Sequence, residues 1–297
     1  MTILAIDFGG TQVKSALISN DLASITSLPT QMSPQDLKSC LTLIDSIVEP
    51  YLEKIEGIAI SSPGTVDTEK GIIYYGGVLR FLHDFHAKSI LEETYQRPVA
   101  VINDGKAAVL AELVRGKLKG IQNGLALILG TGLGGGVIIN GQLYQGSHFQ
   151  AGELTFLLPE KREYQTEDMK GIQVSAVGLI KKIAEVLKLA DKQDGRTVFH
   201  YIEQKDVRIY ALFEEYCRHV AHLILNLQTI LDVECCVIGG GISAQPVLIE
   251  EINRQFDLLH AQVEPIKLIV ERPQILACQF LNDANLLGAA YLLIKSI

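Results

Sequence analysis

The sequence has few cysteines, and their arrangement resembles no metal site. Five cysteines are scattered over 297 residues, no two stand in a CxxC spacing, and none occurs between Cys40 and Cys217. An odd, scattered set without a signal peptide is typical of a reducing compartment, where thiols stay unpaired and buried. We therefore expect buried thiols, a cytoplasmic protein and no structural zinc.

The sequence also lacks a targeting segment, a long apolar run and an excess of basic residues. Its first residues have no basic character and soon reach the carboxylate of Asp7, and no apolar run approaches the roughly 20 residues of a membrane helix. The formal net charge is −8. Because nucleic acids and anionic membranes attract clustered Lys and Arg, we expect neither as a partner. An acidic protein can still bind ATP, since backbone N–H groups and Mg²⁺ offset the charge of the phosphates.

Strand and helix patterns alternate along the chain in two cycles. Strands are expected at 3–8, 13–19, 57–61, 99–102, 125–129, 137–140 and 235–238, and helices at 34–48, 106–117, 174–189, 207–230 and 284–297. The segments 4–11 and 127–132 are both an apolar strand followed by a glycine turn with a threonine. This similarity indicates a duplicated α/β unit, although two such turns also arise by chance. We expect one lobe from 1–117 plus 284–297 and another from 118–283.

The first expected strand ends in a carboxylate and two glycines. The amides around Gly9 and Gly10 would lie open to a phosphate, Thr11 adds a hydroxyl, and Lys14 adds a positive charge. Asp7 can hold Mg²⁺ through water. A tight hairpin capped by the aspartate explains the same residues equally well.

A glycine-rich stretch, residues 130–136, follows the strand at 125–129. Gly130, Gly132 and Gly135 satisfy the GxGxxG spacing of dinucleotide-binding folds, but there the motif opens a helix. Here the chain continues as a strand, so the loop is interpreted as a phosphate cradle between two strands. A purely structural turn is the alternative.

Three further candidates stand at strand ends or in loops. Asn103 and Asp104 follow a strand and precede a helix, where Asp104 could take a proton from a hydroxyl or the pair could simply cap the helix. Glu153 could bind two sugar hydroxyls or be a solvated loop charge. The glycines at 239–241 could admit a purine or ribose, or form a strand-to-helix turn.

These segments occur in the order found in the ROK family (repressors, ORFs, kinases), which the sequence resembles over nearly its whole length. The resemblance implies an α/β, actin/hexokinase-like (ribonuclease H-like) fold of two lobes, with ATP and sugar in the cleft. It implies an ATP-dependent sugar kinase with these site residues: Asp104 as the base; Gly64, Asn103, Glu153 and Phe156 around the sugar; Gly9, Gly10, Thr11, Lys14, Gly130, Thr131 and Gly132 at the phosphates; Gly239, Gly240 and Gly241 by the adenosine; and Asp7 at Mg²⁺.

Two departures from the family pattern concern the C1–C2 edge of the sugar. Many members carry Gly-Glu-x-Gly-His followed by zinc-binding cysteines; here the run is 152–156, and Phe156 replaces a histidine that also touches the sugar. Gap-free counting back from Ser175 puts Gly171 where the family has a sugar-binding glutamate. The loss of two polar groups disfavours a free reducing sugar and favours a substituent on C1. The pattern resembles the zinc-less β-glucoside kinases, which phosphorylate O6 of disaccharides such as cellobiose.

Other functions are compatible with the same sequence. A glucokinase or a kinase of N-acetylmannosamine or fructose shares the same motifs. A sugar-sensing repressor would need a DNA-binding helix-turn-helix before the first strand, and the chain begins at that strand. A catalytically silent sugar-binding module is disfavoured by the presence of both Asp7 and Asp104. Because the family is commonly dimeric, a homodimer is expected.

Overall fold

Two large β-sheets organise the part of the chain that the computed structural model describes, residues 2–280 and 283–297. Each sheet belongs to its own unit with its own hydrophobic core. Among the described residues, unit 1 comprises 2–114, 145–151 and 283–297, and unit 2 comprises 115–144 and 152–280.

The sheet of unit 1 has the order β3-β2-β1-β5-β8, with β4 paired to β2. β1 is antiparallel to β2 and parallel to β5, and β5 is parallel to β8. The strands are β1 Thr2–Phe8, β2 Gln12–Ser19, β3 Ile25–Ser27, β4 Gln31–Met32, β5 Gly57–Ser62 and β8 Val99–Asn103, and β6 Thr65–Asp67 with β7 Ile72–Tyr75 forms a separate hairpin. The helices are α1 Leu37–Val48, α2 Ala87–Tyr95, α3 Asp104–Arg115 and α10 Ala284–Ser296, with the 3₁₀ turns η1 Glu49–Tyr51 and η2 Arg80–Leu82.

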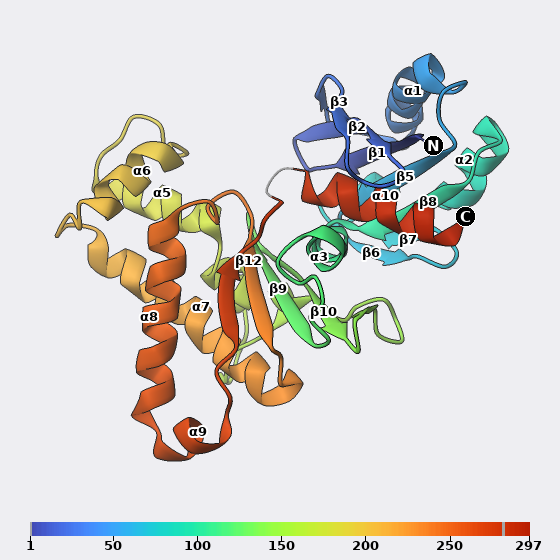
Figure 1. Cartoon of the computed structure of the whole chain (residues 1–297). Coiled ribbons are helices and arrows are strands. Elements are labelled where there is room, and N and C mark those ends of the chain that lie inside the picture. The colour runs from blue at the N-terminus through green and yellow to red at the C-terminus, as the bar shows by residue number, and fades with distance from the viewer. Residues whose placement is uncertain (1, 281–282) are drawn as a thin grey trace. The chain divides into compact units, whose positions relative to one another are not determined.

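Three helices of unit 1, α1, α3 and α10, form where the apolar spacing predicts them, and α2 was not predicted. α1 begins after Asp36, whose side chain accepts a hydrogen bond from the Ser39 amide in a capping box. Its buried face includes Ile44 and Val48, which join the core beside the sheet. α10 packs along β1, β5 and β8 (Figure 1), so the end of the chain completes the unit that its beginning started.

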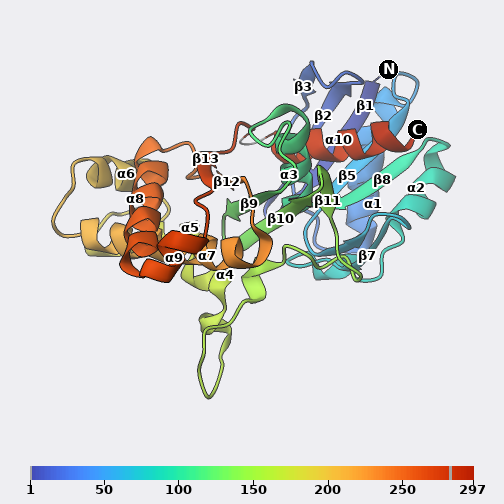
Figure 2. The same cartoon turned by 60° about the horizontal axis from the view of Figure 1, so that its bottom comes forward.

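The sheet of unit 2 has the order β11-β10-β9-β12-β13. Its strands are β9 Gly124–Leu129, β10 Leu133–Ile139, β11 Gln142–Tyr144, β12 Cys235–Gly239 and β13 Gln274–Ala277. Its helices are α4 Lys170–Gln173, α5 Ala176–Val186, α6 Gly195–Glu203, α7 Tyr210–Leu231, α8 Pro246–Gln262 and α9 Glu264–Ile269, with the 3₁₀ turns η3 Leu154–Phe156 and η4 Thr166–Asp168. α7 and α8 pack together beside the sheet (Figure 1). Residues 157–169 form a long segment that protrudes from the rest of unit 2 (Figure 2).

The two sheets repeat one pairing scheme. In each, the first strand of the unit forms an antiparallel hairpin with the second, a third strand extends that hairpin, and two later strands join on the other side in parallel. β1 and β9 hold the same place, so the glycine turns that follow them are equivalent. The expected duplicated α/β unit of the actin/hexokinase-like fold is confirmed.

The expected glycine loop at 130–136 was too long. β10 already begins at Leu133, and its glycines pair with β9, Gly135 opposite Leu127. A β-carbon on Gly135 would lie 3.0 Å from the Ala126 carbonyl oxygen and 3.1 Å from that of Gly152. The glycine therefore lets another backbone segment approach the strand, as glycines inside strands often do. The loop itself is reduced to 130–132.

The cysteines are all buried, as expected, and none forms a disulfide. Burial raises the pKa of the Cys40 thiol to about 12, and it also raises the pKa of the Cys217 and Cys236 thiols. These thiols are packing groups, unsuited to nucleophilic chemistry. Among the described helices, none has the length and apolar character that a membrane crossing demands.

Candidate active site

The carboxyl ends of three parallel strands bring the predicted residues of unit 1 to one edge of its sheet. Asp7 of β1 lies in register with Ser61 of β5, and Ser62 lies in register with Asn103 of β8. The turns that follow these strands therefore begin side by side. In open α/β sheets this edge is where ligands collect.

Asn103 fixes the position of Asp104. Its amide nitrogen donates to the Gly64 carbonyl oxygen at 2.8 Å and to Oδ1 of Asp104 at 3.1 Å, while its Oδ1 accepts from the Lys106 amide at 3.1 Å. Asn103 is thus the residue that caps α3. The helix cap therefore does not require the side chain of Asp104.

Asp104 is the first residue of α3 and is half-buried. Its Oδ1 also accepts from the Gly105 amide at 2.7 Å. The donors from Asn103 and Gly105 hold the carboxylate at the start of α3. A carboxylate held in this way at a ligand-binding edge is chemically able to accept a proton from a hydroxyl.

Asp7 is a buried carboxylate surrounded mainly by neutral groups. Its Oδ1 accepts from the Ser61 hydroxyl at 2.7 Å and from the Asn285 amide at 3.1 Å. Burial raises the pKa of Asp7, whereas the two hydrogen bonds and the charge of Lys14 act in the opposite direction. A cation beside Asp7 would offset this desolvation.

Asp7 would be able to hold a magnesium ion through water, with a bound phosphate supplying further oxygen ligands. No group of three or more His, Cys, Asp or Glu side chains that could hold a metal occurs within residues 2–280 and 283–297. Mg²⁺ in nucleotide sites is usually held by one or two carboxylates together with phosphate oxygens and waters. Asp7 is suited to that single-carboxylate role.

The turn after β1 presents backbone groups to solvent. Gly9 donates its amide to the Gln12 carbonyl oxygen at 3.0 Å, which closes the turn. Ser33 holds it from the side, since its hydroxyl donates to the Gly9 carbonyl oxygen at 2.6 Å and its amide donates to that of Thr11 at 3.0 Å. Gly10 and Thr11 are exposed at the tip. The turn is rigidly supported and open, as a phosphate site requires.

Unit 2 places its two glycine turns next to each other. β9 and β12 are parallel neighbours, with Gly239 opposite Ile128, so the turns 130–132 and 239–241 leave the same edge. Gly240 has φ +98°, and a β-carbon on it would lie 2.0 Å from the Leu129 carbonyl oxygen. Only glycine allows this approach.

The same edge leaves room for a ligand. A β-carbon on Gly130 or Gly241 would meet no atom within 4 Å. The Gly130 carbonyl oxygen is engaged from behind by the Ala176 amide at 2.9 Å, which anchors the turn on the start of α5. The arrangement suits a nucleotide that approaches the backbone closely.

The segment from Glu153 to Phe156 lies in and before η3. Glu153 is half-buried, and Phe156 is 61% exposed. Between them, Thr155 accepts a hydrogen bond on Oγ1 from the Leu133 amide at 3.0 Å, so this segment is tied to the glycine-rich strand. Gly171 packs on Thr155: a β-carbon there would lie 2.2 Å from Thr155 Oγ1.

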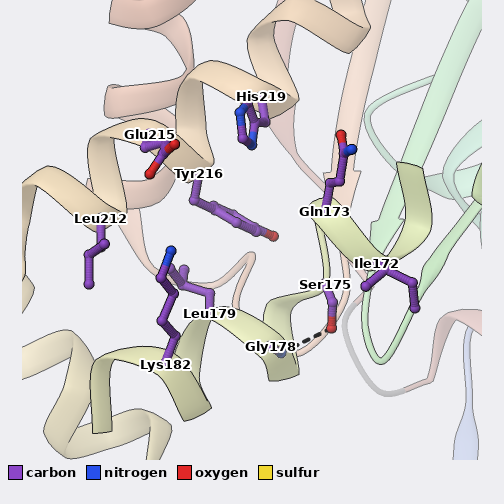
Figure 3. A pocket seen from close by; sticks show the side chains of 10 residues that line it. All are labelled: Ile172, Gln173, Ser175, Gly178, Leu179, Lys182, Leu212, Glu215, Tyr216 and His219. Carbon is purple, nitrogen blue, oxygen red and sulfur yellow. Dashed lines mark hydrogen bonds between the residues drawn. The ribbon is translucent and has the colours of Figure 1, made fainter. Parts of the chain in front are cut away.

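A separate pocket of about 270 Å³ opens in unit 2 between α4, α5 and α7 (Figure 3). Tyr216 projects from α7 into it and donates its hydroxyl to the Val174 carbonyl oxygen at 3.0 Å; Lys182 and Glu215 supply opposite charges. None of the predicted ATP or sugar residues lines it. Ser175, which lines the pocket, donates its hydroxyl to the Gly130 carbonyl oxygen at 3.4 Å, so the pocket adjoins the turn at 130–132.

Several residues of the site carry no sequence motif. Ser33, Ser61 and Asn285 support the turn after β1 and Asp7 from distant parts of the chain. Lys106 is 1% exposed and donates to the Phe149 carbonyl oxygen at 2.6 Å. A lysine on the apolar face of an expected helix was the one available signal, because such a charge is rarely buried without a partner.

The comparisons with known proteins agree with this arrangement. The ROK family model matches residues 3–296. The chain belongs to the ROK family. Its sequence is 31% identical to a β-glucoside kinase of Klebsiella pneumoniae (98% of this chain, 95% of the relative) and 28% identical to one of Listeria monocytogenes (98% and 97%).

Solved structures share the fold across the whole chain. A ROK family protein from Streptococcus pneumoniae in complex with sucrose has a TM-score of 0.87 at 28% identity, covering 100% of this chain and 99% of that one. A ROK family glucokinase from Streptomyces griseus in complex with glucose and AMPPNP has a TM-score of 0.84 at 23% identity, covering 99% and 100%.

Proposed function

We propose that this member of the ROK family transfers a phosphoryl group from ATP to O6 of a β-glucoside such as cellobiose, with Asp104 as the general base. The broader class, an ATP:sugar phosphotransferase, rests on family membership over residues 3–296 and on kinase relatives that match 98% of the chain. The finer assignment concerns the substrate and the roles of individual residues.

In this proposal Asp104 takes the O6 proton as the O6–Pγ bond forms and the bond from Pγ to the ADP oxygen breaks. Asn103 keeps the carboxylate in place and keeps an amide oxygen at the same edge for a sugar hydroxyl. The turns at 9–11, 130–132 and 239–241 would bind the nucleotide through backbone N–H groups. Mg²⁺, held through water by Asp7, would neutralise charge on the phosphates.

The packing of Gly171 on Thr155 is the observation that favours a β-glucoside. No side chain fits at 171 while Thr155 stays in place, so a carboxylate is sterically excluded there. Phe156 adds an exposed aromatic ring where the family pattern has histidine. An edge without these polar groups leaves the C1 hydroxyl of free glucose unpaired, whereas a glycoside has no such hydroxyl.

A sugar panel tests the assignment. We expect kcat/KM for cellobiose to exceed the values for glucose and N-acetylmannosamine, with ³¹P and ¹³C NMR placing the phosphate on O6. Phe156→His is the matched variant, and it should move the preference toward free glucose. A strong preference of the unmodified protein for free glucose would reject the β-glucoside assignment and leave the kinase class intact.

A further inference from the structure

Unit 1 contains a second pocket, distinct from the one between α4, α5 and α7. It has a volume of about 440 Å³ and lies between the β6–β7 hairpin and the loop 145–151. Its lining residues are Thr65, Asp67, Lys70, Tyr74, Tyr75, Ser147, His148, Phe149 and Gln150. The volume lies within the range of small-molecule sites.

The two segments that form this pocket, the β6–β7 hairpin and the loop 145–151, are each hydrogen-bonded, directly or through the neighbouring residue, to a residue close to Asp104 in the chain. Thr65 directly follows Gly64, whose carbonyl oxygen accepts the Asn103 amide at 2.8 Å. On the other wall, the Phe149 carbonyl oxygen accepts from the buried Lys106 ammonium at 2.6 Å. Asn103 and Lys106 flank Asp104 in the chain, so the pocket is built outward from the first turn of α3.

The pocket combines exposed rings with polar edges. Tyr74 is 37% and Tyr75 is 51% exposed, and the hydroxyl of Tyr74 donates to Asp67 Oδ2 at 3.1 Å. Asp67 also accepts the amides of Glu69 and Lys70, so it serves to hold the hairpin turn and Tyr74. Exposed aromatic side chains that line a pocket often mark a ligand-binding site.

The aromatic and polar side chains that line the pocket favour a neutral ligand with a hydroxylated ring. A pyranose offers an apolar face of C–H groups to an aromatic ring and hydroxyls around its rim. Tyr75 supplies the ring, and the exposed side chains of Ser147, His148 and Gln150 supply donors and acceptors. The charges of Asp67 and Lys70 lie 4.0 Å apart and offset each other, which disfavours a charged ligand.

We infer that this pocket binds the second sugar ring of a disaccharide whose first ring is presented to Asp104. The inference rests on the proposed β-glucoside kinase function and adds the location of the aglycone subsite. Tyr75 and His148 would be specificity-determining residues, contacting the sugar that does not react. Their contribution would appear in substrates that carry a second ring and vanish in those that do not.

The test compares cellobiose with methyl β-glucoside, which keeps the β-linkage and lacks the second ring. Tyr75→Ala should lower kcat/KM for cellobiose by about 10-fold, chiefly through KM, because the ligand loses an apolar surface. The value for methyl β-glucoside should change by less than about 2-fold. Tyr75→Phe keeps the ring and should behave like the unmodified protein with both substrates.

Two variants guard against indirect effects. His148→Ala alters an exposed loop residue on the opposite wall and should reproduce the selective loss. Tyr144→Ala removes a ring that is 50% exposed and outside the pocket, and it should affect neither substrate.

Each result decides between the two hypotheses. If cellobiose is a substrate and Tyr75→Ala lowers both glucosides equally or neither, the subsite is wrong and the kinase assignment stands. If the unmodified protein phosphorylates glucose and neither glucoside, the proposed function fails and the subsite fails with it.

Discussion

At the scale of single residues, the two aspartates of unit 1 have opposite environments. Asp104 is half-buried, and its Oδ1 accepts hydrogen bonds from the Asn103 side-chain amide and the Gly105 backbone amide. Asp7 is 8% exposed, and burial raises its pKa. This difference is consistent with the two proposed roles. A general base must be accessible to the hydroxyl that it deprotonates, whereas a buried carboxylate that holds a metal ion has its charge offset by that ion.

Asp104→Asn should lower kcat by about 10²-fold or more, since the amide cannot take the O6 proton. Sugar affinity should remain measurable, because the amide still hydrogen-bonds; isothermal titration against cellobiose checks this. Asp84→Asn, at an exposed aspartate, is the control. Near-normal turnover of Asp104→Asn would remove the residue from the role of base.

Asp7→Asn should stabilise the ligand-free protein near neutral pH while lowering Mg²⁺-dependent turnover. The folded protein holds the Asp7 proton more tightly than the unfolded chain does, so ionisation costs stability as pH rises from the ordinary value of 3.8 through the raised folded pKa. Asparagine does not ionise. Melting temperatures over a pH series should therefore show a gain that disappears below about pH 3.8; a pH-independent gain would contradict this cause.

At the scale of elements, η3 and α4 meet through a close contact. Thr155 on η3 hydrogen-bonds the first residue of β10 and leaves Gly171 on α4 no room for a side chain. The start of β10 and the helix α4 are thereby fixed relative to each other within unit 2.

Gly171→Ala should destabilise the protein by about 1–3 kcal/mol, because the added methyl group collides with Thr155. Pairing it with Thr155→Gly should recover part of that loss, which a double-mutant cycle in urea measures as a coupling energy. Ile172→Ala, at the exposed neighbouring position, should change stability by less than about 0.5 kcal/mol. Strict additivity of the two substitutions would show that the contact carries no energy.

At the scale of the whole molecule, each unit has its own apolar core. The cysteines are buried packing groups, and the described residues contain no cluster of metal-ligating side chains. We expect a divalent ion to act with the nucleotide and to take no part in the folding of either unit.

EDTA should therefore abolish turnover and leave the melting temperature of the ligand-free protein unchanged. Addition of Mg²⁺ should restore activity fully, and Zn²⁺ should not be required; calorimetry and a coupled ADP-release assay record the two effects. A drop in melting temperature on chelation would reveal a structural metal. With ATP, Mg²⁺ and cellobiose together, binding should raise the melting temperature.

The sequence by itself determined most of the strand and glycine-turn pattern and the family resemblance, because local apolar spacing and glycine placement report directly on strands and turns. It only indicated the duplicated unit, which the pairing of the strands established. It also marked Asp7 and Asp104, which stand at strand ends. The tertiary structure decided what the chain brings together across long separations. Ser61 and Asn285 meet Asp7, Thr155 meets Gly171, and Lys106 meets Phe149. No periodicity encodes such contacts, since they depend on how strands pair and where a side chain finds space.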